Sequence, residues 1–292
     1  MTSAAPARAQ RLDPTFGGDW PLVLGFAALA IPTLVTLGEQ TWSTEAGGHG
    51  PIVLATGAWL LWRQVPEFRS EAAPGAPWLT GAMLALALAA YVFGRAYDYI
   101  TLEAGGVYGV GLAMLHAKFG LRLLLKNWFP FFYLAFAVPP PTSVLDALTS
   151  PLKHFVTMAS TTTLSHFGLP VARQGVTIFV AQYQMLVEDA CSGMNSLIGL
   201  TAISLFYIYL LRGSSLAYSL LLTCFIVPIA ILANILRIMI LILLTYFFGD
   251  AVAQGFLHFT AGVFLFATAL ALVFALDRVL FAIVGRRLRR AA

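Results

Sequence analysis

Charged side chains are scarce in this chain. Only 10% of its 292 residues are charged, whereas 59% are hydrophobic, and a soluble domain has roughly a quarter of its residues charged. This composition excludes a soluble enzyme or binding module and indicates a membrane protein. The net charge of +4 does not indicate a nucleic-acid partner, because the basic residues stand singly between apolar segments and gather only at the C-terminus. The expected partner is the lipid bilayer.

Cysteine and metal-ligand clusters are also scarce. The two cysteines, Cys191 and Cys224, fall in different apolar segments, so we expect no disulfide and a free thiol at Cys191. Cys224 is expected to be a small core residue. No histidine, cysteine or carboxylate pair has the spacing of a metal site. The sequence therefore predicts neither a metal nor another cofactor.

The N-terminal 20 residues contain Pro6, Arg8, Arg11, Asp13 and Pro14 but no apolar core. We therefore expect no cleaved signal peptide, and the first span to act as an uncleaved anchor.

Apolar windows long enough for a bilayer recur along the chain. Since a helix needs about 20 mostly apolar residues to cross, we predict an all-α polytopic membrane protein with about eight transmembrane helices. The candidate spans are 21–38, 50–63, 78–94, 100–116, 128–147, 194–211, 216–245 and 259–283. For the long segment before residue 249 we expect one crossing to about Leu236, with Pro228 as a site for a kink.

The basic residues set the expected orientation. With a cytoplasmic N-terminus, eight spans place nine single basic residues and all four C-terminal arginines inside, 13 of the 17, in agreement with the positive-inside bias. The domain prediction is a cytoplasmic tail at 1–20, one transmembrane domain at 21–285 and a basic cytoplasmic tail at 286–292. Residues 148–192 form an extracytoplasmic insertion. Its first half suits an amphipathic interfacial helix, and its second half, GVTIFVAQYQMLVED, predicts a β-hairpin.

Polar residues concentrate where this hairpin ends, in VEDACSGMNSL. Cys191 stands at the start of the span near Met194, where unpaired helix amides favour a thiolate. Ser192 adds a potential hydrogen bond, and Gly193 permits a tight turn. Glu188 and Asp189 oppose the thiolate, so a nearby cation is required.

Arg237 is the expected source of that cation. It cannot lose its charge, and an arginine inside a membrane is costly unless it has a function. Asn234 lies one turn earlier, so both can face one acceptor. His258 opens the last span and is suited to proton transfer. Each residue also has a structural interpretation: a packed cysteine, a snorkelling arginine and a capping histidine. The expected topology brings all three to one membrane face.

These motifs resemble a known family. EDACSGMNSL, PIAILANILRIMIL and GFLHFTAG are similar to segments of the exosortase and archaeosortase family of membrane cysteine enzymes, and WSTEAGGHGPIVLATGAWLLWR is similar to its N-terminal pattern. The resemblance implies a catalytic trio of Cys191, Arg237 and His258. It implies substrates with a C-terminal sorting tail: a short motif often containing Pro-Glu-Pro, a hydrophobic span and a basic end. It also implies cleavage or transpeptidation through a thioester at the outer face of the cytoplasmic membrane.

The sequence is thus compatible with two alternative functions. The first is this cysteine endopeptidase or transpeptidase. The second is a non-enzymatic transporter or assembly factor for exported polymers, in which Arg237 and His258 line a polar path. The sequence specifies neither the sorting motif nor the acceptor, and it does not specify the oligomeric state.

Overall fold

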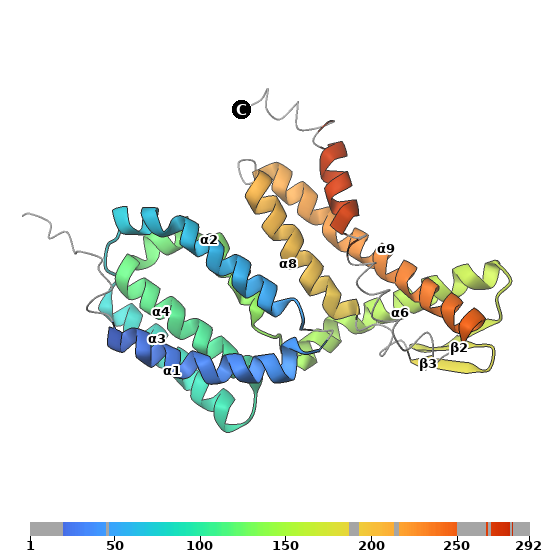
Figure 1. Ribbon diagram of the computed structural model, residues 1–292, viewed down its shortest axis with the longest axis horizontal. Helices are drawn as coiled ribbons and strands as arrows, with labels where there is room; N and C mark the ends of the chain where they lie inside the picture. Colours follow the sequence, from blue (N-terminus) through green and yellow to red (C-terminus); the bar gives the residue numbers. More distant parts are fainter. Residues whose placement is uncertain are drawn as a thin grey trace, which may run out of the picture. The chain divides into compact units, whose positions relative to one another are not determined.

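Helices make up most of the chain, and one small sheet lies between two of them in the sequence (Figure 1). The computed structural model describes residues 20–44, 47–186, 193–212, 216–249, 267, 270–280 and 282. Among these residues, four helices are long and apolar enough to cross a bilayer: Trp20–Trp42, Pro77–Ala96, Ile100–Lys126 and Leu220–Phe248. The helical membrane class is therefore confirmed, with four candidate spans in the described part against the eight predicted.

The chain divides into two units. The first comprises Met1–Val35 and Leu61–Asn127, and the second comprises Thr36–Leu60 and Trp128–Ala292. Most of the first unit consists of α1 (Trp20–Leu37), the end of α2 (Gly50–Ser70), α3 (Pro77–Ala96) and α4 (Ile100–Lys126).

A buried carboxylate ties three helices of the first unit together. Glu103 on α4 is only 3% exposed. It accepts hydrogen bonds from Thr33 Oγ1 of α1 at 2.8 Å and from Arg95 Nη1 of α3 at 3.0 Å. Gly94 allows the close approach, because a Cβ there would collide with the Glu103 backbone. Since a buried charge is costly unless it is paired and hydrogen-bonded, these contacts fix α1, α3 and α4 relative to one another.

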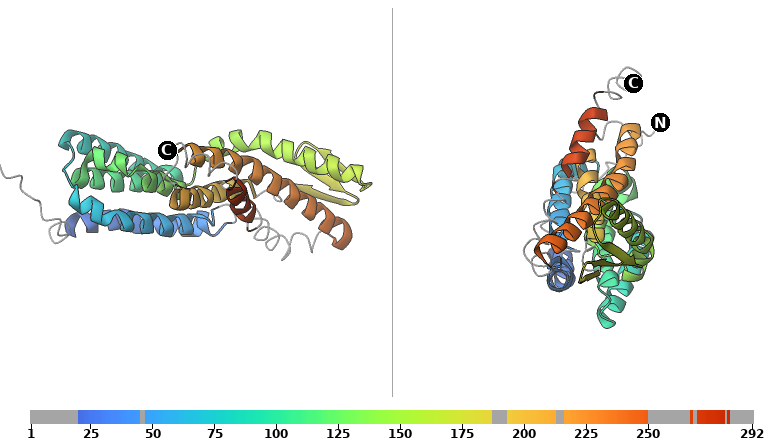
Figure 2. Two further views of the ribbon diagram at one scale, coloured as in Figure 1. Left: turned by 90° about the horizontal axis from the view of Figure 1, so that it is seen from above. Right: turned by 90° about the vertical axis from the view of Figure 1, so that its right-hand side faces the viewer.

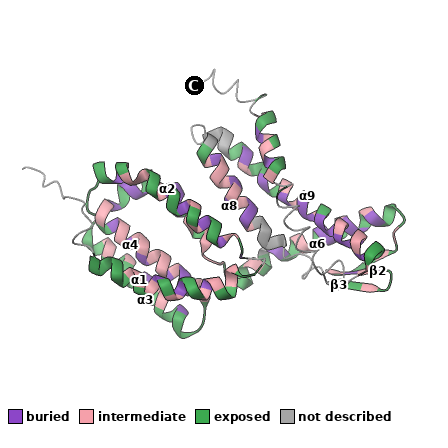
Figure 3. Cartoon of the chain, viewed as in Figure 1, coloured by how far each residue is buried: buried purple, intermediate pink, exposed green. Residues whose placement is uncertain are grey.

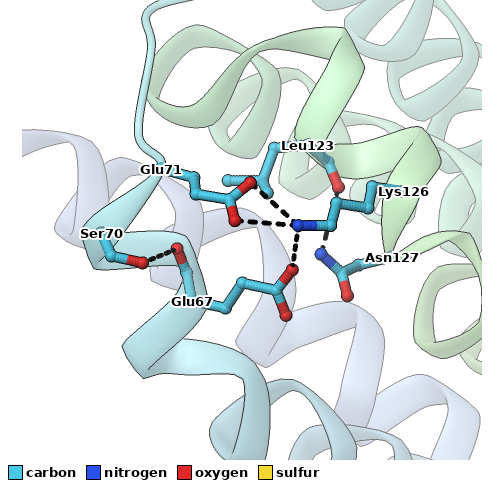
Figure 4. A network of polar contacts seen from close by, with 6 residues as sticks. All are labelled: Glu67, Ser70, Glu71, Leu123, Lys126 and Asn127. Carbon is cyan, nitrogen blue, oxygen red and sulfur yellow. Dashed lines mark hydrogen bonds and ion pairs between the residues drawn. The ribbon is translucent and has the colours of Figure 1, made fainter.

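A second charged cluster joins α2 to the end of α4. Lys126 Nζ lies 2.8 Å from Glu67 Oε1 and 2.8 Å from Glu71 Oε1 (Figure 4). The hydrogen bond from Lys126 holds the pKa of the Glu67 carboxyl below its usual 4.5, against a smaller opposing effect of desolvation.

This cluster predicts a pH-dependent contribution to stability. Because the pKa of Glu67 is lowered in the folded chain, the contribution is complete above about pH 4.5 and is lost as the pH falls through the folded pKa. Lys126→Met should therefore lower the melting temperature slightly at pH 7, and the gap to the wild type should narrow as the pH falls below 4.5 and through the folded pKa of Glu67. Thermal unfolding in detergent measures this gap. Arg122→Met, at an exposed position on the same helix, is the control, and a gap unchanged at low pH would contradict the assignment.

In the second unit the predicted span 128–147 is wrong. Instead, α5 covers Trp128–Leu134, a 3₁₀ helix η3 covers Ala135–Ala137, and α6 begins only at Thr142 and ends at His166. The segment between them contains three consecutive prolines, Pro139 to Pro141. Proline supplies no N–H and holds the preceding residue extended, so one helix cannot continue through this segment.

The predicted β-hairpin is confirmed and is part of a larger sheet. β2 (Thr177–Val180) and β3 (Tyr183–Leu186) are antiparallel and joined through Ala181, whose φ is +51°. A third strand, β1 (Val171–Gln174), pairs with β2, which gives the order β1-β2-β3.

The predicted amphipathic helix lies within α6, whose buried face packs on the sheet and on α9 (Leu216–Phe248). Val156 and Leu164 of α6 form one core cluster with residues of β2 and α9: Ile178, Val180, Ile238 and Ile242. Ser160, between Val156 and Leu164 on the same face, is fully buried. Figure 2 shows α6 and α9 side by side with the sheet next to them. Buried positions recur along both helices (Figure 3).

Helix α9 is longer than a bilayer requires. Its 33 residues include Pro228 and form one helix of about 50 Å, whereas the hydrocarbon core is about 30 Å thick. The helix thus continues beyond Leu236, where the crossing is predicted to end, and its later part to Phe248 is covered by α6 and the sheet. Cys224 on α9 is an exposed free cysteine, so its predicted place in the core is also wrong.

Candidate active site

The predicted site residues are divided between described and undescribed parts of the chain. Cys191, Glu188, Asp189, Ser192 and His258 lie outside the described residues. Described are Asn234 and Arg237 on α9, and the backbone of Gly193, where α8 (Gly193–Arg212) begins.

Asn234 and Arg237 are both buried within the second unit. Each is only 5% exposed, and their spacing of three residues places them on one face of α9. Placing an arginine at the centre of a bilayer costs about 2.5–3.5 kcal/mol by insertion scales. The cost is smaller near the membrane surface, and in either place a buried guanidinium must be paired or hydrogen-bonded.

The pairing of α8 with α9 shows what lies level with Arg237. The two helices are adjacent and antiparallel (Figure 1). Ile208 of α8 clusters with Leu222 and Ile226 near the start of α9, and Leu200 clusters with Ala230 and Ala233 further along.

This register can be extended to the beginning of α8. Gly193 lies seven residues before Leu200, and Arg237 lies seven residues after Ala230 and four after Ala233. Because equal steps along antiparallel helices cover equal distances, the first turn of α8 is level with Arg237. Arg237 is thus level with the turn that begins at Gly193, two residues after Cys191 in the sequence.

Helix α6 packs against the same part of α9. The buried Ser160 hydroxyl donates to the backbone carbonyl of Ile235 at 3.3 Å. Thr157 and Thr161, on neighbouring turns of α6, are also buried and bond to carbonyls of their own helix. These hydroxyls were not predicted from the sequence, although their spacing of three to four residues marks one helix face.

His49, which the sequence places in a loop where it either lines the site or faces water, lies close to α8. An ideal Cβ built on Gly199 would be only 3.0 Å from the Cβ of His49, so the absence of a side chain at Gly199 makes room for His49. His49 precedes α2 in a tight turn, where Gly50 N–H donates to the Gly47 carbonyl at 2.8 Å. Gly199 is six residues, about 9 Å, from the start of α8.

Comparison with known families decides the relationship of this chain. The model of the transmembrane exosortase family matches residues 41–275, which include α8, α9 and the loop that carries His49. The chain belongs to the transmembrane exosortase family. Searches of the curated proteins and of the solved structures give no match. The resemblance seen in the sequence motifs is thereby confirmed, and the matched range includes the three exosortase-like positions Cys191, Arg237 and His258.

The described residues of this exosortase contain no group of three or more histidine, cysteine, aspartate or glutamate side chains placed to hold a metal ion. The polar side chains that α9 presents there are instead a guanidinium and an amide, Arg237 and Asn234, whose N–H groups are hydrogen-bond donors. Such groups are suited to stabilising negative charge on an oxygen atom.

Proposed function

We propose that this exosortase-family protein is a membrane-embedded cysteine endopeptidase or transpeptidase that cleaves C-terminal sorting tails of exported proteins. One observation carries the proposal: the α8/α9 register holds the buried Arg237 level with the turn that follows Cys191. Catalysis of acyl transfer needs a nucleophile and a fixed donor for the developing oxyanion. Cys191 and Arg237 supply these two groups.

Cys191 acts as the nucleophile. The free amides of the first turn of α8 favour the thiolate, while Glu188 and Asp189 oppose it. Arg237 either offsets these acids or pairs with one of them. The sulfur attacks the scissile carbonyl, a C–S bond forms, and the C–N bond breaks to give a thioester.

Arg237 and Asn234 stabilise the oxyanion of the tetrahedral intermediate. A guanidinium presents a planar fork of N–H donors, and the Asn234 amide adds another from the same helix face. His258 protonates the leaving amine and then activates water or an acceptor nucleophile, which attacks the thioester and releases Cys191. Water yields hydrolysis, and an amine or hydroxyl acceptor yields transpeptidation.

The proposed location is the cytoplasmic membrane, with the active site near its outer face. Residues 1–20 and 286–292 are placed in the cytoplasm, and 148–192 outside, within one transmembrane domain at 21–285. The length of α9 supports this arrangement. About 20 residues from Leu216 cross the hydrocarbon and end near Leu236, which leaves Arg237 at the outer boundary under α6 and the sheet.

A tail reporter tests this function: an epitope-tagged exported protein from the same genome whose C-terminus carries a Pro-Glu-Pro motif, an apolar span and a basic end. In proteoliposomes with the purified chain, the reporter should lose its tail, as seen by a mass shift of its amino-terminal fragment. A matched reporter with the motif scrambled should stay intact. If the chain acts as a transporter or assembly factor, both reporters remain full-length.

The His49 loop predicts an effect on the same assay. Gly199→Leu would displace His49 from α8, and a shift of about 1 Å near an active site can cost about 100-fold. We expect at least a tenfold lower rate of reporter cleavage with the melting temperature nearly retained. Gly105→Leu, where an ideal Cβ meets nothing within 4 Å, is the control. A Gly199→Leu variant that cleaves at the wild-type rate would show that the position of His49 does not matter for cleavage.

A further inference from the structure

β3 is an edge strand that leads toward the proposed nucleophile. In the order β1-β2-β3, it pairs only with β2 within the described part of the chain. Leu186, its last residue, precedes Cys191 by five positions. The strand is therefore covalently close to the reacting sulfur.

The register shows which backbone groups point away from β2. Each turn of the sheet has two residues between paired positions: Gln174 pairs with Thr177, and Val180 pairs with Tyr183. In antiparallel hairpins with two-residue loops, the flanking pair is hydrogen-bonded, and successive residues alternate in direction. Tyr183 and Met185 therefore bond to β2, whereas the N–H and C=O groups of Gln184 and Leu186 point outward.

The core side of β3 is fixed against α9. Met185 is buried in contact with Leu241, and an ideal Cβ on Gly249, just past the end of α9, would lie 3.3 Å from the Tyr183 hydroxyl. Tyr183 therefore lies near Gly249, and Met185 lies near Leu241. From Tyr183 to Met185, β3 thus runs along α9 toward lower residue numbers, in the direction of Arg237. Gln184, between these two anchors, is exposed.

We propose that the outward edge of β3 binds the substrate backbone as an added strand, using the segment on the amino side of the scissile peptide. This inference rests on the proposed cleavage of sorting tails. Each outward residue offers one donor and one acceptor, which an extended peptide matches regardless of its side chains. Continuity with Cys191 identifies the occupant, because five residues span at most about 18 Å, so a peptide aligned on β3 lies within reach of the sulfur.

The direction of this added strand follows from the membrane anchor. A sorting tail runs from the exported domain inward to its own membrane span, and β3 runs from the outer end of α9 toward Arg237. Both chains therefore have the same direction, and the pairing is parallel. Since Gln184 precedes Cys191 by seven positions and an extended chain covers about 3.3 Å per residue, the paired substrate residues lie at most about seven positions before the scissile bond.

Gln184→Pro tests the edge from the enzyme side. Proline removes the outward N–H without removing a bond to β2, and its φ of about −65° is tolerated at sheet edges. With the tail reporter we expect at least a tenfold loss of kcat/KM, while Gln184→Ala stays within about twofold of the wild type. Labelling of Cys191 by N-ethylmaleimide should proceed at the wild-type rate, which shows that the fold is retained.

Backbone-modified reporters test the edge from the substrate side and need no enzyme variant. An ester in place of one amide removes a single N–H donor. Wild-type enzyme should cleave the reporter at least fivefold more slowly when an ester lies within the paired segment, and normally when it lies after the scissile bond. Equal cleavage of every ester reporter, or an unimpaired Gln184→Pro enzyme, would overturn the edge-strand proposal. If cleavage also persists in Cys191→Ala, the proposed function itself fails.

Discussion

Replacing Cys191 with alanine is expected to abolish cleavage of the tail reporter, by at least about 1,000-fold. The thioester cannot form without the sulfur, and loss of a catalytic nucleophile typically removes nearly all chemical catalysis. The protein should remain folded, because one sulfur atom contributes little to packing. Cleavage is measured in proteoliposomes by the mass of the amino-terminal fragment, and folding by the melting temperature.

Cys224→Ala provides the matched control. Cys224 is a free cysteine exposed on α9, so its replacement should leave cleavage unchanged and should leave Cys191 as the single thiol. Full activity of Cys191→Ala together with a folded protein would exclude Cys191 as the nucleophile and with it the cysteine mechanism.

Arg237→Lys is expected to lower kcat by about 100-fold to 1,000-fold with little change in KM. Loss of one oxyanion donor typically costs this much. Lysine keeps the positive charge but not the planar fork of N–H donors, so the variant separates geometry from charge. Because the charge is kept, the cysteine should still form a thiolate, and its labelling rate should change little.

Two further variants serve as a comparison and a control for Arg237→Lys. Asn234→Ala, on the same buried face, should show a smaller loss of kcat of about tenfold, since it removes a neutral donor. Arg278→Lys, at an exposed position, should have wild-type kinetics. If Arg237→Lys changed KM alone, Arg237 would be a binding residue and the proposed oxyanion role would be wrong.

Local sequence signals predicted the elements whose causes are local. The Ala-Gln-Tyr-Gln centre predicted the hairpin, because turn residues and β-branched flanks act over a few positions. β1 was missed, since its sequence VARQ is short and half polar and acquires its partner only when the hairpin exists. The break before α6 had a clear local signal in Pro139–Pro141. The predicted span nevertheless ran through these prolines, because the residues on either side of them are apolar.

Contacts between distant segments had no signal in the sequence. The bonds of Thr33 and Arg95 to Glu103 depend on how α1, α3 and α4 pack. The same holds for the approach of His49 to Gly199 and for the register of α8 on α9. For the candidate site, the sequence identified Arg237 and Asn234 by their chemistry. Only the packing of α8 and α9 shows that Arg237 is level with the turn after Cys191.

Trapping of the acyl-enzyme tests the central claim most directly. The Cys224→Ala variant, in which Cys191 is the single thiol, is incubated with the tail reporter, quenched with acid during turnover and analysed by intact mass and peptide mapping. The account predicts an adduct of the amino-terminal reporter fragment on Cys191, with the tail released, which neutral hydroxylamine cleaves. Reporter cleavage without any adduct, or an adduct on a residue other than Cys191, would contradict it.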